Sequence, residues 1–245
     1  MRYKKTVFLL IIFIFSHISS CSNPPFSHYT SRHDEYMQTQ LPREAFVKIR
    51  SKITIKNCAA GICSRRTLAS TGSGFIIGVG EKGSFVMTAA HVCRDDEESA
   101  NRLLEHKIID IDGNEHVGIT LAYNIKADIC LMYATGLTNK KALTVSQKEP
   151  KPGDRLYNLA APVGIFDINM IPILDGYYNG VSRGSAVYSI PAAGGSSGSP
   201  VLNSDMQVIG LIHSLHRAFP MITIGPTYEE IKEFIETNVE KYSNL

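Results

Sequence analysis

The 245-residue sequence carries almost no excess of charge, with 25 basic and 23 acidic side chains and a formal net charge of +2. Three of the basic residues, Arg2, Lys4 and Lys5, fall within the first 20 residues, which contain no acid. Without that segment the chain has 22 basic and 23 acidic residues. A near-neutral balance gives no argument for an electrostatic nucleic-acid surface, so we expect no nucleic-acid partner.

The sequence also lacks an internal repeat, a low-complexity tract and an apolar run that spans a bilayer. The apolar run over residues 6–15 is shorter than the roughly 20 residues that a spanning helix needs. It follows a basic head and precedes Ser16-His17-Ile18-Ser19-Ser20-Cys21. A charged head, a short apolar core and a small-residue end predict a secretory signal over residues 1–20.

The residues Ile18-Ser19-Ser20-Cys21 resemble a bacterial lipobox, in which the cysteine is lipidated and becomes the first residue. Small residues directly precede Cys21, as processing requires. We therefore expect a lipoprotein held on a membrane in the cell envelope, facing the periplasmic or extracellular side. The alternatives are a simple signal peptide with an unrelated cysteine and an uncleaved anchor. Residues 21–44 are polar, irregular and contain three prolines, which predicts a flexible tether.

The body of the protein, residues 45–245, consists of short apolar runs separated by Gly, Asn, Asp and Pro, a pattern typical of an all-β barrel or sandwich. A helical period appears clearly only over residues 227–241, where Ile231, Phe234, Ile235 and Val239 share one face. The expected strands are residues 46–55, 74–78, 85–89, 117–123, 129–134, 155–160, 185–190, 200–203 and 208–213.

Four cysteines remain besides Cys21, an even number that favours disulfides in an exported chain. Of the three possible pairings we prefer Cys58–Cys63, which closes a small loop, and Cys93–Cys130, which braces the elements that hold His91 and Asp128. Zinc ligation is an alternative, although the spacings lack a paired C-x2-C form. Free buried thiols are another, and no metal site is expected.

Three stretches carry the candidate chemistry. Ala193-Gly194-Gly195-Ser196-Ser197-Gly198-Ser199-Pro200 is a tight glycine-rich turn that can expose a serine hydroxyl and aim backbone N–H groups at one point. Thr88-Ala89-Ala90-His91 ends an apolar strand with small residues before a histidine, a suitable base for a serine. Asp128 stands at the start of an apolar strand and needs a partner such as an imidazole N–H. Asp110 and Asp112 compete for that role, but residues 109–114 resemble a hairpin turn.

These stretches, in the order His, Asp, Ser, resemble the signatures of trypsin/chymotrypsin-like serine proteases, with a pattern similar to bacterial glutamyl endopeptidases and HtrA-type proteases. The resemblance implies two six-stranded antiparallel β-barrels, at about residues 45–145 and 150–225, with the site between them. It also implies Ser197 as nucleophile, His91 as general base and acid, and Asp128 as orienting carboxylate. The backbone N–H groups of Gly195 and Ser197 would form the oxyanion hole, and no cofactor is implied.

The sequence departs from the digestive enzymes of this family. Ser196 replaces the aspartate that pairs with a freed N-terminus, and no Ile-Val-Gly-Gly-like start occurs. These differences argue for a site that is formed without activation cleavage. The resemblance implies that substrate side chains are read by residues before the nucleophile and on the strand that contains His213; the candidates are Ala192, Ala193, Gly194, His213 and Ser214. A glutamate-selective pocket at His213 and a preference for small apolar residues both remain open.

The leading hypothesis is an exported, lipid-anchored serine endopeptidase that cleaves protein or peptide substrates through an acyl-enzyme. The first alternative is a catalytically silent protease-fold protein that binds partners at the cell surface. The second is an esterase, disfavoured because no Gly-x-Ser-x-Gly elbow follows a strand and precedes a helix.

Overall fold

A computed structural model describes residues 41–59, 62–94 and 102–242. The predicted signal peptide, Cys21 and nearly all of the predicted tether lie outside these residues. In the described ranges, no helix has the length and apolar character needed to span a membrane.

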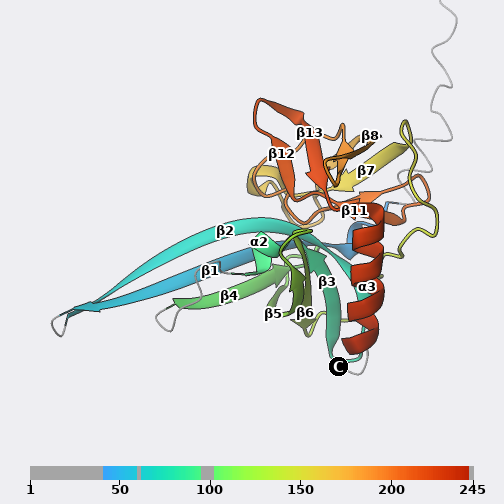
Figure 1. Cartoon of the computed structure of the whole chain (residues 1–245). Helices are drawn as coiled ribbons and strands as arrows, with labels where there is room; N and C mark the ends of the chain where they lie inside the picture. The colour runs from blue at the N-terminus through green and yellow to red at the C-terminus, as the bar shows by residue number, and fades with distance from the viewer. Residues whose placement is uncertain (1–40, 60–61, 95–101, 243–245) are drawn as a thin grey trace, which may run out of the picture. The chain divides into compact units, whose positions relative to one another are not determined.

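The first half of the fold is a closed antiparallel barrel with the strand order β1-β2-β3-β6-β5-β4 (Figure 1). Aliphatic residues fill it, and every residue of β3 is buried. The short helix α2 (Ala90–Cys93) follows β3. The strands are β1 (Phe46–Ala59), β2 (Ile62–Val79), β3 (Gly83–Thr88), β4 (Arg102–Ile109), β5 (Glu115–Asn124) and β6 (Ile129–Thr135).

The second half is a seven-stranded antiparallel sheet with the order β11-β10-β7-β8-β9-β13-β12. Its two outermost strands, β11 and β12, are consecutive in the chain and are separated only by Ile212 and His213. The first and last strands of the sheet are therefore two parts of one stretch of chain, so the sheet curls back on itself. The strands are β7 (Arg155–Leu159), β8 (Ile173–Ser182), β9 (Ser185–Tyr188), β10 (Pro200–Leu202), β11 (Val208–Leu211), β12 (Ser214–His216) and β13 (Phe219–Gly225).

The predicted all-β, chymotrypsin-like fold class is confirmed. The first barrel has the six strands expected. The second sheet has seven instead of six, because β11 and β12 are two parts of what would otherwise be one strand. The interruption has a local cause: the backbone N–H of Ile212 donates to Ser199 at 3.0 Å, whereas that of His213 donates to Ile224 at 3.0 Å, so consecutive residues pair with different neighbours.

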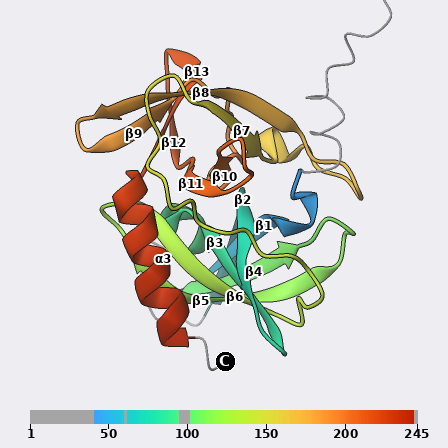
Figure 2. The same cartoon turned by 90° about the vertical axis from the view of Figure 1, so that its right-hand side faces the viewer.

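The C-terminal helix α3 (Tyr228–Tyr242) contacts both halves of the fold (Figure 2). Thr227 and Glu230 form a reciprocal capping box, with bonds of 3.2 Å and 2.9 Å, so the helix begins at a defined residue. Near its start the Tyr228 hydroxyl donates to the Ser146 carbonyl at 2.7 Å. At its end the Tyr242 hydroxyl donates to the Leu121 carbonyl in β5 at 3.0 Å.

The hairpin of β1 and β2 extends past the barrel (Figure 1). Strand β4 pairs with β1 only as far as Ile55, and β3 pairs with β2 only from Phe75 onward. Beyond these points, as far as the structure describes the chain, the two strands pair only with each other, to a tip where Cys58 lies opposite Cys63 and is joined to it by a disulfide. We call residues 56–58 of β1 together with residues 62–71 of β2 the arm.

Candidate active site

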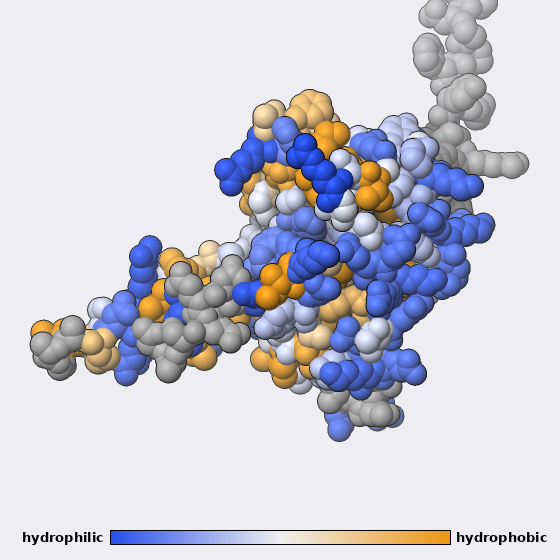
Figure 3. Space-filling model, in the orientation of Figure 1, coloured by the Kyte–Doolittle hydropathy of each residue, from blue (hydrophilic) through white to orange (hydrophobic). Residues whose placement is uncertain are grey.

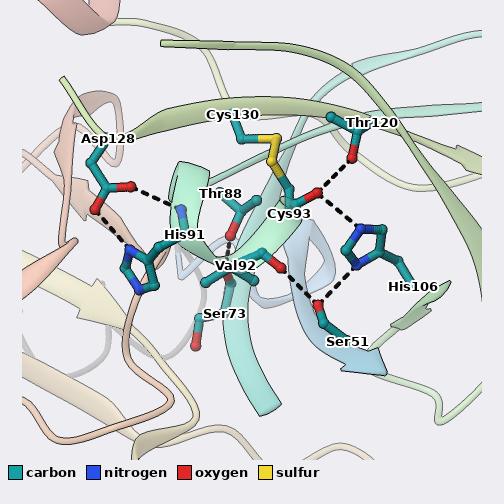
Figure 4. The surroundings of a disulfide bond; sticks show 10 residues. All are labelled: Ser51, Ser73, Thr88, His91, Val92, Cys93, His106, Thr120, Asp128 and Cys130. Atoms are coloured by element: carbon teal, nitrogen blue, oxygen red, sulfur yellow. Dashed lines mark hydrogen bonds and ion pairs between the residues drawn. A yellow bond between two sulfur atoms is a disulfide. The ribbon is translucent and has the colours of Figure 1, made fainter. Parts of the chain in front are cut away.

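His91 and Asp128 are brought together by the pairing of β3 with β6. Thr88 at the end of β3 lies opposite Cys130 in β6, so the residues just outside both strand ends are neighbours. The His91 Nδ1 atom lies 2.7 Å from Asp128 Oδ2, and the His91 backbone N–H donates to Oδ1 at 3.0 Å (Figure 4). Asp128 adopts φ 53°, a conformation uncommon for a non-glycine residue, and both of its carboxylate oxygens point to His91.

A disulfide between Cys93 and Cys130 braces this pair (Figure 4). It connects α2 to β6, two residues beyond His91 and two beyond Asp128, with a Cα–Cα distance of 6.5 Å. The other predicted bridge, Cys58–Cys63, is also present. Both predicted pairings are confirmed, which leaves none of these four thiols available as a zinc ligand.

The electrostatics of Asp128 favour its ionised form. Burial alone would raise the pKa of the Asp128 carboxyl, but the hydrogen bonds from the His91 ring and backbone hold that pKa below its ordinary value, and the nearby His213 imidazole adds to this effect. An ionised carboxylate on Nδ1 fixes the proton of neutral His91 there, which leaves Nε2 as the basic nitrogen.

Ser197 lies on the loop between β9 and β10, and residues of the first barrel fix this loop. The Ser73 backbone N–H donates to the Ser197 carbonyl at 2.8 Å, and the buried Ser73 hydroxyl donates to the Gly195 carbonyl at 2.8 Å. A Cβ atom at Gly198 would lie 2.1 Å from Thr88 Oγ1, so only glycine permits this approach. The loop thus packs directly against the end of β3, three residues before His91.

The backbone N–H groups of Gly195 and Ser197 have no acceptor among the residues that the structure describes. Their orientation follows from the carbonyls of the same peptide units, since N–H and C=O point in opposite directions across a trans peptide. The Gly194 carbonyl accepts from Val163 N at 2.6 Å, and the Ser196 carbonyl accepts from Ser199 N at 3.0 Å. Each carbonyl is held by the protein, so each partner N–H is available to an anionic oxygen.

The Ser197 hydroxyl points toward the carbonyl of His213, to which it donates at 3.5 Å. Within the described part of the chain, no hydrogen bond joins this hydroxyl to His91. The hydroxyl must turn from the His213 carbonyl toward the His91 ring before a proton can pass to that imidazole.

The residues predicted to bind substrate are connected through β13. The backbone N–H of Ala192 donates to the Pro220 carbonyl of β13 at 3.2 Å, and Ser214 pairs with Ile224 of the same strand. Ala193 and Gly194 lead into the Ser197 loop. The His213 imidazole lies beside Asp128, with Nδ1 3.8 Å from Oδ2. The glutamate-selective pocket stays a prediction.

Asp110 and Asp112, the alternatives to Asp128 in the sequence, lie in the turn between β4 and β5. Asp110 is buried in the predicted turn, where its Oδ1 accepts the backbone N–H groups of Asp112 and Asn114 at 3.0 and 2.9 Å. Burial would raise the pKa of Asp110, but the Asn114 bonds and Lys140 lower it.

Sequence reasoning did not identify Ser73 or Val163 as residues that orient the Ser197 loop. Ser73 had a signal in retrospect, because it is a polar residue directly before a buried apolar run.

Comparison with known proteins identifies the family of this chain. The profile of the family described as "Trypsin-like peptidase domain" matches residues 72–211, which is more than half of the chain. A search of curated proteins found no match. Among solved structures, the serine endoprotease from Yersinia pestis is similar, with a TM-score of 0.62 at 16% identity. The likeness covers 85% of this chain but only 66% of that protein, and at this identity it supports the fold alone. The chain belongs to the trypsin-like peptidases, a family of serine proteases.

Proposed function

We propose that the protein is a serine endopeptidase in which His91, Asp128 and Ser197 form a catalytic triad. The observation that carries the proposal is the double hydrogen bond from His91 to Asp128 beside a serine loop with two available N–H groups. Ser197 Oγ attacks the peptide carbonyl carbon while its proton passes to His91 Nε2. The developing oxyanion is stabilised by the N–H groups of Gly195 and Ser197.

The tetrahedral intermediate collapses when the C–N bond breaks, and the departing amine takes the proton from His91. A water molecule then gives a proton to His91 Nε2 and attacks the acyl carbon, which releases the acid and restores the Ser197 hydroxyl. Asp128 stays ionised throughout and stabilises the imidazolium. No step requires a cofactor.

Labelling with a fluorophosphonate probe tests this chemistry, because the probe modifies only an activated serine. We expect a single modified residue, Ser197, by peptide mass spectrometry, and no labelling of Ser197→Ala.

One observation favours the silent binding protein instead: the Ser197 hydroxyl is directed to His213 rather than His91. Catalytic hydrogen bonds often form only when substrate is bound, so this does not exclude turnover. An unlabelled, folded wild-type protein would support the silent scaffold.

The anchoring at Cys21 is part of the proposal and is supported by the signal and lipobox pattern of residues 1–21. A Cys21→Ala variant expressed in a bacterial host tests it by cell fractionation. We expect the variant to leave the membrane fraction or to remain unprocessed. Unchanged retention of a processed variant would contradict lipidation.

A further inference from the structure

Strand β2 leaves one of its edges unpaired along the arm. β1 pairs with one edge over the whole length of β2, but β3 meets the other edge only from Phe75 onward. Residues 64–71 are all exposed, and among the described residues the free edge has no hydrogen-bonded neighbour. The space-filling view shows the arm projecting from the barrel (Figure 3). An exposed strand edge is a template for another extended chain.

One end of this free edge of β2 lies against Ser197, the proposed catalytic serine. The Ser73 backbone N–H donates away from β1, to the Ser197 carbonyl, at 2.8 Å. Because peptide groups alternate sides along a strand, Thr71, Ala69, Thr67 and Arg65 point their N–H and C=O groups in the same direction. A peptide that leaves the cleft here meets a continuous row of unpaired donors and acceptors.

The side of the cleft identifies which part of a substrate would lie there. In the proposed mechanism His91 gives its proton to the departing amine, so the residues after the cleaved bond lie next to α2. Val92 of α2 packs on β2, since a Cβ atom at Gly72 would meet its Cγ1 at 2.7 Å. The edge before Gly72 therefore continues from the leaving-group side.

The charge of the hairpin identifies the chemistry of the partner. Residues 46–72 contain six basic side chains and no acid. Those near the barrel have partners: Lys48 donates to Gly164, and Arg50 and Lys52 pair with Glu115 and Glu105. The three on the arm, Lys56, Arg65 and Arg66, form no ion pair with any described residue. Lys56 lies directly opposite Arg65, an unfavourable like-charge pair that a bound anion would relieve.

We propose that the arm binds an extended, acidic segment of the substrate, on the C-terminal side of the cleaved bond, as an additional strand on β2. The Cys58–Cys63 disulfide closes the hairpin tip, so the edge is formed before substrate arrives. The inference rests on the proposed peptidase function and specifies its substrate class.

The test compares three peptides with the same residues around the cleaved bond. One ends two residues after it, one continues for ten residues of alternating Glu and Thr, and one continues with alternating Lys and Thr. We expect kcat/KM to be about tenfold higher for the acidic extension than for the short peptide at low salt, and the advantage to shrink as salt is raised. Equal values for the three peptides would overturn the proposal.

Two variants separate backbone pairing from charge. Thr67→Pro removes one outward N–H without breaking a bond to β1, and the Arg65→Glu/Arg66→Glu pair reverses the charge. Both should abolish the advantage of the acidic extension and leave cleavage of the short peptide unchanged. Lys151→Glu, an exposed charge reversal in the second half, is the matched control and should retain the advantage. An advantage that survives both arm variants would contradict the proposal.

Binding to Ser197→Ala separates this inference from the proposed function. Fluorescence anisotropy should show tighter binding of the acidic extended peptide than of the other two, and Thr67→Pro should remove the difference. If the wild type cleaves no peptide, the endopeptidase proposal fails, while this measurement still decides whether the arm binds acidic chains.

Discussion

The Nδ1 atom of His213 lies 3.8 Å from Oδ2 of Asp128, the same oxygen that faces the ring of His91. Burial lowers the pKa of the His213 imidazole, although the Asp128 carboxylate and, more weakly, Glu230 oppose the shift and His91 adds to it. When His213 is neutral, it does not compete with His91 for the Asp128 carboxylate. A protonated His213 would compete with His91 for that oxygen and place a positive charge beside the His91 ring.

This arrangement predicts a pH-dependent stability. The pKa of His213 is lower in the folded chain than its ordinary value of 6.5, so the unfolded chain binds more protons just below that pH. Stability is therefore lost as pH falls through the ordinary value and is unaffected well above it. We expect the melting temperature of the wild type, relative to His213→Asn, to be lower at pH 5.5 than at pH 7.5. The exposed His216→Asn is the control, and parallel melting curves for wild type and His213→Asn would contradict the prediction.

Asp128→Asn should lower kcat by about 10⁴-fold at neutral pH, because an amide at this position favours the wrong tautomer of His91. KM should change little, since Asp128 does not face the substrate in the proposed mechanism. Steady-state kinetics on a peptide substrate measure both. Asp112→Asn removes an exposed carboxylate that pairs with Lys140 and should keep wild-type kcat. A decrease in kcat for Asp128→Asn of less than about tenfold would argue against the triad.

Gly195→Ala should both unfold the protein more easily and abolish activity. Gly195 has φ +98°, and an added Cβ atom would lie 2.5 Å from the Ala161 carbonyl oxygen, so the loop must move and displace its N–H groups. Gly184→Ala isolates the backbone strain, because Gly184 has φ +78° with no atom within 4 Å of the new Cβ. We expect Gly184→Ala to cost about 1 kcal/mol and to retain activity. Similar activities for the two variants would contradict the role of the Gly195 loop.

Removal of each disulfide should have a different effect. Cys93 and Cys130 are 37 residues apart, so the Cys93→Ala/Cys130→Ala pair should cost about 4 kcal/mol of unfolding free energy and reduce kcat by loosening His91 against Asp128. Cys58 and Cys63 are 5 apart and lie at the arm tip, so their removal should cost about 2 kcal/mol and leave short-peptide kcat unchanged. Chemical denaturation and kinetics give both quantities. Equal kcat values for the two variants would exclude a bracing role for Cys93–Cys130.

Short local motifs were enough to predict where His91 and Asp128 lie and how the cysteines pair. His91 follows the buried strand β3 by three residues and Asp128 directly precedes the buried strand β6, and the two strands are neighbours in the closed barrel. The arm was not predicted, because β1 was expected to end at residue 55 and β2 to begin at residue 74. Among residues 56–73 the large aliphatic side chains are only Ile62 and Leu68, and a hairpin that is exposed on both faces gives no alternating pattern.

The side-chain contacts between the two halves also could not be predicted. Ser73 orients the Ser197 loop through two hydrogen bonds to residues more than 120 positions away, and local sequence has no pattern for such a pairing. The direction of the His213 side chain depends on the interruption between β11 and β12. A shift of one residue reverses a strand face, so the sequence left this direction open.

Helix α3 has a consequence for synthesis. It is the last described element, and its two tyrosines attach to carbonyls of Ser146 and Leu121, one in the segment between the halves and one in the first barrel. A ribosome that has not yet released residues 228–242 holds a chain whose halves lack this clamp. We expect the two halves to gain these two attachments only after translation of the helix is complete.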